Sequence, residues 1–215
     1  MKHSVLPKPV RDEVVRILVL VSGNGTTLQA LIQAEHQGRL GGGGIEAVLT
    51  DRPGVYALER ATVAGIPVYT AQDLPGKSPQ ALSDCILHRA LTVRADLIIL
   101  AGFLSILRGD ILRVYRGRMI NLHPSLLPKF GGPGMYGERV HRAVLAAGAG
   151  ESGCTVHLVD AGTDTGPILL QRRVPVLPGD SPQDLGERVH RAEQGAIVEA
   201  TALMVRRIRQ ERFSV

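Results

Sequence analysis

Residues 16–28 read Arg16-Ile-Leu-Val-Leu-Val-Ser-Gly-Asn-Gly-Thr-Thr-Leu28. After Arg16, residues 17–21 form a short apolar run, as in a fully buried strand. Two glycines then interrupt the chain, and the threonines open a run with helical spacing of apolar residues that continues to Gln37. A strand, a tight glycine turn and a helix are the first half of a βαβ unit, so this stretch predicts a parallel sheet.

The rest of the chain repeats this alternation as far as residue 122. We expect strands at 45–50, 66–69, 96–100 and 119–122, and helices at 55–64, 81–94 and 106–115. A helix at 138–147, two strand-like runs at 153–159 and 168–174, and a long helix at 182–209 follow. The fold class is therefore α/β: a doubly wound, mostly parallel, Rossmann-like sheet with antiparallel edge strands and a long C-terminal helix.

Length and charge limit the domain count and the partners. The chain has 215 residues, a net charge of +5 and no Trp. This length suits one well-buried domain, which we place at residues 15–215, after a flexible N-terminal extension at residues 1–14. The excess of positive charge comes without a basic patch interleaved with aromatic residues. We therefore expect small anionic substrates and no nucleic-acid partner.

The sequence contains no segment typical of membrane insertion or export, and no spacing typical of disulfides or metal sites. The longest apolar run is far too short to span a bilayer, and residues 1–13 have no apolar signal-peptide core, so we expect no membrane association. Cys85 and Cys154 have neither paired nor metal-type spacing, which suits a reducing cytoplasm. No spacing of His, Cys and acidic residues indicates a metal site. The sequence does not decide the oligomeric state, and a homodimer is one possibility.

The segment Asn121-Leu-His-Pro-Ser-Leu-Leu-Pro128 follows an expected strand and carries an amide and an imidazole one residue apart. With Asp164 as a carboxylate partner and His157 in support, the imidazole could stay protonated near neutral pH, and the amide could help it stabilise an oxyanion. Groups of this kind can catalyse acyl transfer without a protein nucleophile. Taken alone, an Asn-x-His before proline is more often a strand end with a satisfied imidazole. The turn also makes the Leu127–Pro128 bond a candidate for cis geometry.

The loop at residues 160–164 lies between the last two expected strands and consists of Asp, Ala, Gly and Thr. Most of these are turn-forming residues, so an ordinary turn is the simplest interpretation. We expect this loop, including Asp164, to face solvent.

The glycine loop at residues 22–28 has the character of a phosphate site. Small residues let a phosphate approach the backbone, and free N–H groups at the start of a helix can bind it. The third glycine of the dinucleotide fingerprint is replaced by Leu28, so we expect no nucleotide cofactor. A simple Thr-capped helix is the alternative.

A second stretch resembles a P-loop motif, except that Ala71 stands at the position of the first glycine: Ala71-Gln-Asp-Leu-Pro-Gly-Lys-Ser78. Pro75 removes an N–H group that such a loop needs, and no later strand ends in a Walker-B acid. The pair Ser78-Pro79 fits better as the N-cap and first residue of a helix. Nucleotide hydrolysis is therefore not expected.

Four segments, at residues 22–28, 100–104, 121–128 and 164–168, occur here in the order found in the folate-dependent glycinamide ribonucleotide formyltransferases. The chain resembles this family over nearly its whole length. The segment at 121–128 is shared by a wider formyltransferase superfamily and points to the chemistry, whereas residues 22–28 and the short length point to the substrate. The resemblance implies transfer of the formyl group of 10-formyltetrahydrofolate, a co-substrate, to the amine of glycinamide ribonucleotide in purine synthesis.

The resemblance also implies a role for each candidate site residue. The catalytic residues would be Asn121, His123 and Asp164, with His157 supporting them. The phosphoribosyl group would be held by Gly25, Thr26, Thr27, His190 and Glu193. The folate would contact Lys77, Leu104, Ser105, Ile106, Leu107, Asn121, Asp160, Ala161, Gly162, Thr163 and Asp164. Two positions depart from the family pattern, because Thr27 stands where Asn is usual and Ser105 where a basic residue is common.

Three alternatives remain open. A formyltetrahydrofolate hydrolase shares the segment at 121–128, but its family carries an extra N-terminal regulatory domain that we do not expect here. A methionyl-tRNA formyltransferase would need a C-terminal tRNA-binding extension, which we also do not expect. A non-enzymatic phosphometabolite-binding protein would keep residues 22–28 and have no use for a linked Asn, His and Asp.

Overall fold

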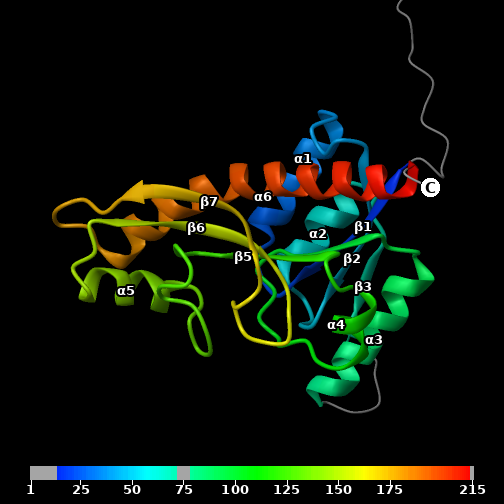
Figure 1. The fold of residues 1–215 in the computed structure, drawn as a ribbon, viewed down its shortest axis with the longest axis horizontal. Coiled ribbons are helices and arrows are strands. Elements are labelled where there is room, and N and C mark those ends of the chain that lie inside the picture. The colour runs from blue at the N-terminus through cyan, green and yellow to red at the C-terminus, as the bar shows by residue number, and fades with distance from the viewer. Residues whose placement is uncertain (1–13, 72–77, 214–215) are drawn as a thin grey trace, which may run out of the picture.

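The computed structural model describes residues 14–71 and 78–213. Its elements in chain order (Figure 1) are β1 (Val15–Val21), α1 (Thr26–His36), β2 (Gly43–Thr50), α2 (Tyr56–Val63), β3 (Val68–Thr70), α3 (Pro79–Thr92), β4 (Leu97–Leu100), α4 (Asp110–Val114), β5 (Met119–His123), α5 (Glu138–Ala146), β6 (Glu151–Leu158), β7 (Ile168–Pro175) and α6 (Pro182–Phe213). Residues 1–13 of the expected N-terminal extension lie outside the described residues.

The described strands form one sheet in the order β3-β2-β1-β4-β5-β6-β7. The strands from β3 to β5 pair in parallel, whereas β6 and β7 are added antiparallel at one edge. This arrangement and the long helix α6 confirm the predicted fold class. The strand order reverses at β1 and β4, and open sheets of this kind bind ligands at the carboxyl ends of strands near such a point.

Both faces of the central strands are covered by helices. Because side chains alternate along a strand, Ile17 and Val19 of β1 pack on one face with α1 and α6, and Leu18 and Leu20 pack on the other with α3 and α4. Figure 1 shows α6 running along the α1 side of the sheet, with α3 and α4 on the opposite side. This double coverage explains why β1 is apolar throughout and has no polar face.

Some element boundaries differ from the prediction. The helix expected at 106–115 begins only at Asp110, because Gly109 takes φ 72° and ψ −144°, a conformation that no helix contains. Helix α3 begins two residues before the predicted start. The expected cap is confirmed there: the Ser78 side chain accepts a hydrogen bond from Ala81 N at 3.1 Å, and Pro79 follows it.

The turn after β5 is held by the hydroxyl of Thr155 on β6. The Leu127–Pro128 bond is cis, as the turn suggested. The Thr155 hydroxyl donates to the carbonyl of Ser125 at 2.6 Å and accepts from the N–H of Leu127 at 3.0 Å. The amide of Gln171 on β7 donates to the same hydroxyl at 2.9 Å. One buried hydroxyl thus ties the loop after β5 to both antiparallel strands.

Replacing Thr155 with valine should destabilise the protein by about 1–3 kcal/mol, because its buried partners would lose their hydrogen bonds while the shape of the side chain is nearly kept. Thr201 on α6 supplies a matched control, since it is equally buried and its hydroxyl has no partner among the described residues. Thr201→Val should leave stability unchanged or raise it. Urea unfolding of the two variants measures both effects, and equal losses would contradict the assigned role of Thr155.

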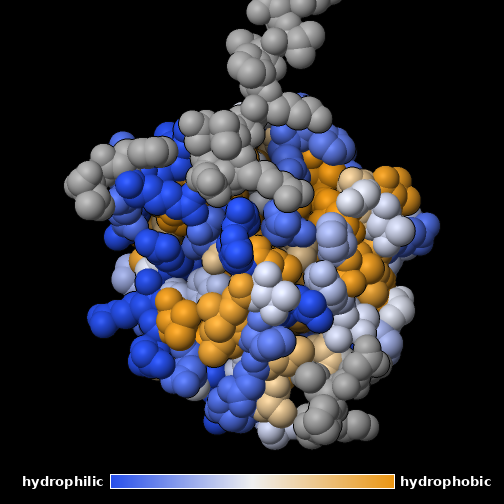
Figure 2. All heavy atoms as spheres, turned by 90° about the vertical axis from the view of Figure 1, so that its right-hand side faces the viewer, coloured by the Kyte–Doolittle hydropathy of each residue, from blue (hydrophilic) through white to orange (hydrophobic). Residues whose placement is uncertain are grey.

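The surface is mixed. Figure 2 shows the face at the right-hand side of Figure 1, where apolar areas lie among hydrophilic ones. Within residues 14–71 and 78–213, no helix combines the length and the apolar character needed to cross a membrane. Even α6, with 32 residues, carries charged side chains along its whole length.

Candidate active site

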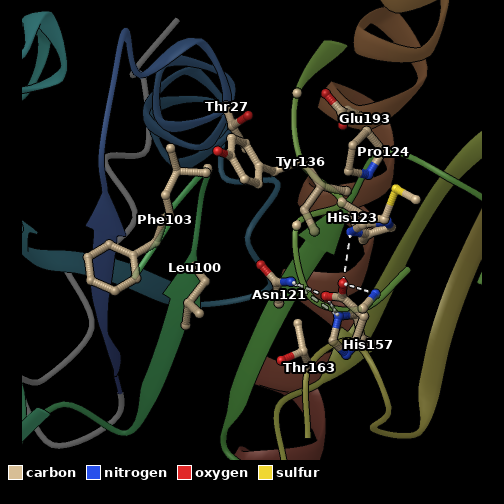
Figure 3. Close-up of a pocket in the computed structure, with 18 of the residues that line it drawn as sticks. Thr27, Leu100, Phe103, Asn121, His123, Pro124, Tyr136, His157, Thr163 and Glu193 are labelled. Atoms are coloured by element: carbon tan, nitrogen blue, oxygen red, sulfur yellow. Dashed lines mark hydrogen bonds and ion pairs between the residues drawn. The ribbon is translucent and has the colours of Figure 1, made fainter. Parts of the chain in front are cut away.

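A cavity of about 850 Å³ opens at the carboxyl ends of β4 and β5. Its walls come from the loops at residues 102–107, 132–137 and 159–164, from α5, and from the first turns of α6. Figure 3 shows Asn121 and His123 in the middle of it, with Thr27 and Glu193 toward one end, His157 and Thr163 toward the other, and Leu100 to the side of Asn121. The carboxyl ends of the strands where the sheet order reverses, and the polar cluster at the end of β5, thus open into one cavity.

His123 lies at the end of β5 with 3 % of its surface exposed. Its Nε2 is 2.8 Å from the carbonyl oxygen of Phe130, and its Nδ1 is 3.3 Å from Oδ2 of Asp164. A carbonyl and an ionised carboxylate both only accept hydrogen bonds. The ring can donate to both partners only when both of its nitrogens carry hydrogen.

Asp164 supplies the negative charge. Residues 160–162 of its loop are exposed as predicted, but the expectation that Asp164 faces solvent is wrong, because its side chain is only 9 % exposed. Burial alone would raise the pKa of Asp164. The contact with His157, a hydrogen bond from Gly132 N at 3.0 Å and the nearby ring of His123 outweigh burial, so the pKa lies below its usual value. The carboxylate is therefore ionised at neutral pH.

Asn121 and His157 face each other across the antiparallel pair of β5 and β6. The amide nitrogen of Asn121 lies 3.2 Å from Nε2 of His157 and 3.4 Å from Oδ1 of Asp164. The Nδ1 of His157 donates to the carbonyl of Leu158 at 2.9 Å, which fixes its ring. Register alone therefore places a rigid histidine beside the Asn121 amide and the carboxylate.

The start of α1 forms one boundary of the cavity. The predicted alternative of a Thr-capped helix is wrong, because Gly25 is the N-cap, with φ 73°, and no side chain caps the helix. A Cβ at Gly25 would lie 2.6 Å from Cβ of Ala57, so the approach of α2 also requires glycine here. The N–H groups of the first turn have no capping side chain. Thr27 lines the large cavity at this end.

Two residues of α6 face Thr27 across the cavity. Nδ1 of His190 lies 3.0 Å from Oε2 of Glu193, one turn further along the helix. This hydrogen bond raises the pKa of His190 above its usual value, although burial acts in the opposite direction. The pair offers both a donor and a charged acceptor to a ligand at this end.

The loop after β4 lines the other end. The buried hydroxyl of Ser22, at the end of β1, accepts a hydrogen bond from Leu104 N at 2.8 Å and so fixes the loop to the sheet. The hydroxyl of Ser105 donates to Oδ2 of Asp51 at 2.6 Å. Leu104 and Ile106 expose 44 % and 49 % of their surface respectively, although each contributes to the cavity wall. Apolar side chains held open in this way form a binding surface for a flat, largely apolar group.

The comparisons with known proteins agree with this geometry. The model of the formyl transferase family matches residues 15–201, which is most of the chain. The chain belongs to the formyl transferase family. This finding confirms the resemblance that the four sequence segments indicated.

Individual formyl transferases are similar at comparable levels. The chain is 39 % identical over 179 residues to phosphoribosylglycinamide formyltransferase of Escherichia coli, covering 83 % of this chain and 82 % of that protein. It is 43 % identical over 191 residues to the trifunctional purine biosynthetic protein adenosine-3 of Drosophila melanogaster, covering 88 % of this chain but only 14 % of that protein. The crystal structure of glycinamide ribonucleotide transformylase 1 from Symbiobacterium toebii superposes with a TM-score of 0.84 at 38 % identity, covering 94 % of this chain and 93 % of that one.

Most of the predicted site residues meet in this formyl transferase cavity. It is lined by Thr27, Leu104, Ser105, Ile106, Leu107, Asn121, His123, His157, Asp160, Gly162, Thr163, Asp164, His190 and Glu193. Gly25 and Ala161 do not contribute to its wall. Thr26 lines a separate, smaller cavity with Arg60 and Gln194. Lys77 lies outside the described residues.

The sequence interpretation missed several groups. The carbonyl of Phe130 and the N–H of Gly132 are backbone atoms, which leave no residue-type signal. Arg60 reaches from α2 to the carbonyl of Asn24 at 2.9 Å, beside the start of α1. His141, to which the sequence analysis gave no role, also lines the cavity. It lies on the buried side of α5, together with Val140 and Val144.

No metal site accompanies these residues. Within the described ranges, 14–71 and 78–213, no group of three His, Cys, Asp or Glu side chains could hold a metal ion. The polar groups of the cavity are instead donors and acceptors of hydrogen bonds around one buried imidazole.

Proposed function

We propose that this protein is a phosphoribosylglycinamide formyltransferase, which transfers the formyl group of 10-formyltetrahydrofolate to the amine of glycinamide ribonucleotide. The observation that carries the proposal is the enclosed set of His123, Asp164 and Asn121 at the middle of a cavity with two different ends. The relatives from Escherichia coli and Symbiobacterium toebii, which the chain matches over most of their length, bear this name or that of a glycinamide ribonucleotide transformylase.

The two substrates would enter from opposite ends. The phosphate of the ribonucleotide would bind the N–H groups at the start of α1, near Gly25, Thr26 and Thr27. His190 and Glu193 would meet its ribosyl part. The pterin of the folate would lie on the apolar loop that contains Leu104 and Leu107, next to residues 160–164. The amine and the formyl group would then meet beside His123.

The reaction needs no protein nucleophile. The substrate amine attacks the formyl carbon directly, and the carbonyl oxygen becomes an oxyanion. The hydrogen on Nδ1 of His123 faces the cavity alongside Asp164 at 3.3 Å, a long contact that an incoming oxyanion can share. The amide of Asn121 supplies a second donor. Fixed donors at a developing charge in an enclosed site are worth several kcal/mol, about 2.7–4 for a single donor.

Asp164 would also assist proton movement. The attacking amine must lose a proton, and the departing folate nitrogen must gain one. The ionised carboxylate of Asp164 lies beside the oxyanion position and accepts a proton more readily once positive charge develops on the amine. Before the proton moves, the same carboxylate orients the ring of His123 through the contact at 3.3 Å.

A deformylation assay tests the proposal and separates it from the hydrolase alternative. The protein is incubated with 10-formyltetrahydrofolate in the presence and absence of glycinamide ribonucleotide, while tetrahydrofolate release is followed. We expect release only with the ribonucleotide, together with formyl-phosphoribosylglycinamide. Release without it would indicate a hydrolase. Binding of the ribonucleotide with no release under either condition would indicate a non-enzymatic binding protein.

Inorganic phosphate should compete with glycinamide ribonucleotide and not with the folate, because only the ribonucleotide needs the anion site at α1. The expected result is a KM for the ribonucleotide that rises with phosphate concentration while the KM for the folate stays constant. Chloride at matched ionic strength is the control, since screening alone weakens any charged contact. A rise in the folate KM alone would place the anion site elsewhere.

A further inference from the structure

His141 is a buried histidine that the proposed reaction does not use. It lies on α5 with 8 % of its surface exposed, and its ring forms part of the cavity wall. Its Nδ1 is fully enclosed and has no hydrogen-bond partner among the described residues. Buried polar atoms of proteins nearly always have a partner, so an enclosed ring nitrogen without one limits where the ring can carry its hydrogen.

The ring occupies a gap on the cavity side of α6. Gly186 lies four residues before His190 and seven before Glu193, so these three positions share one face of the helix. A Cβ on Gly186 would lie 3.1 Å from Cδ2 and 3.3 Å from Nε2 of His141. Glycine weakens the interior of a helix, and here it makes room for this ring. His141 therefore extends the row formed by His190 and Glu193.

The ring presents one hydrogen-bond donor to the cavity. Burial lowers the pKa of His141, and the carboxylates of Glu193 and Glu138 offset this only in part, so the ring is neutral at neutral pH. A neutral ring holds one hydrogen. Enclosed N–H groups without a partner are rarer than enclosed acceptors. The hydrogen therefore belongs on Nε2, the nitrogen that is not enclosed.

We propose that His141 is a further substrate-binding residue, whose Nε2–H donates a hydrogen bond to an uncharged oxygen, a ribose hydroxyl or the amide carbonyl, of glycinamide ribonucleotide. This inference rests on the proposed function. A neutral donor suits an uncharged oxygen, and the proposed site for the phosphate is at the start of α1. Together, His141, His190 and Glu193 would recognise the part of the substrate between its phosphate and its amine.

Three substitutions test the position of the donor. His141→Gln can place an amide N–H near the position of Nε2, His141→Asn can place one only near Nδ1, and His141→Leu removes both. We expect the KM for glycinamide ribonucleotide to rise about 3- to 10-fold in the Asn and Leu variants, the usual worth of one uncharged hydrogen bond. The Gln variant should stay within about twofold of the parent, and the KM for the folate should not change in any of them.

His88→Asn is the matched control, because His88 is exposed on α3 and contributes nothing to the cavity wall. Thermal melting of each variant separates loss of packing from loss of binding. A KM for the ribonucleotide that is the same in the Asn, Leu and parent proteins would overturn the proposal, as would an equal rise for both substrates.

Failure of the proposed function can be told apart from failure of this inference. If the parent protein does not formylate the ribonucleotide, the function is wrong, and calorimetric titration with glycinamide ribonucleotide then tests His141 directly. Weaker binding by His141→Asn than by His141→Gln would still support the donor. No binding by the parent protein would refute both.

Discussion

Replacing His123 with alanine should lower kcat by about 10²–10⁴, the usual contribution of one acid–base or oxyanion-stabilising group. The reason is that, in the proposed mechanism, Nδ1 of His123 is the donor nearest the position where the oxyanion forms. Its anchor, the Phe130 carbonyl at 2.8 Å from Nε2, holds the ring in one orientation. The KM for either substrate should change much less, because the donor acts mainly on charge that develops in the transition state.

Steady-state kinetics with both substrates measures this effect. His88→Ala is the control, since that side chain is exposed on α3. Because His123 is buried, melting curves must show that the variant is folded, and His123→Gln, which keeps a polar side chain, serves as a second test. A folded His123→Ala protein with near-normal turnover would remove the oxyanion role from this residue.

The second large effect is expected from Asp164→Asn, which removes a charge while nearly keeping shape. Catalysis should fall by orders of magnitude, about 10²-fold or more, because His123 loses the anion 3.3 Å from its Nδ1 and, in the proposed mechanism, the reacting amine loses a proton acceptor. Residual activity should extend toward lower pH, because the variant lacks the carboxylate that becomes protonated there. A pH profile of kcat in both proteins measures this.

The same substitution should change the pH dependence of stability. The pKa of Asp164 is lower in the folded protein than its ordinary value of 3.8. A carboxyl group with a lowered folded-state pKa binds fewer protons when folded, so it adds stability above its unfolded pKa. That stability is lost as the pH falls through the folded pKa. The parent should therefore lose stability on acidification more steeply than Asp164→Asn below about pH 4.

Asp110→Asn provides the comparison for both measurements, because Asp110 is 67 % exposed on α4. Full turnover in Asp164→Asn, with an unchanged pH profile, would mean that another acid supports His123.

Much of the fold could be predicted because its signals are local. Uninterrupted apolar runs such as residues 17–21 are typical of strands buried on both faces, and their alternation with helical periodicity indicated a parallel sheet. The change of pattern after residue 137 indicated the antiparallel edge. Helix boundaries that depend on the backbone conformation of a single residue could not be predicted as well. The conformation of Gly109 delays α4, and nothing in the apolar pattern at Ile106 and Leu107 reveals it.

The candidate site likewise contains residues that the sequence revealed and features that it did not. Asn121 and His123 were recognisable because the chemistry of their side chains and their place after a strand point to a site. Asp164 was paired with them through the family resemblance. Its burial was missed, since a loop of turn-forming residues predicts exposure.

The sequence by itself determined the order of strands and helices, the segment that carries the imidazole and the glycine turn before α1, because each depends on residues close together in the chain. Only the tertiary structure decided what surrounds the imidazole. The amide of Asn121 and the carboxylate of Asp164 are 43 residues apart, and the register of β5 against β6 brings His157 to them. The Phe130 carbonyl and the Gly132 N–H are main-chain groups; every residue has such a carbonyl, and every residue but proline has such an N–H. Likewise, His141 reaches the cavity only because α5 packs on a glycine of α6. Contacts of this kind depend on the packing of distant elements, which no local pattern encodes.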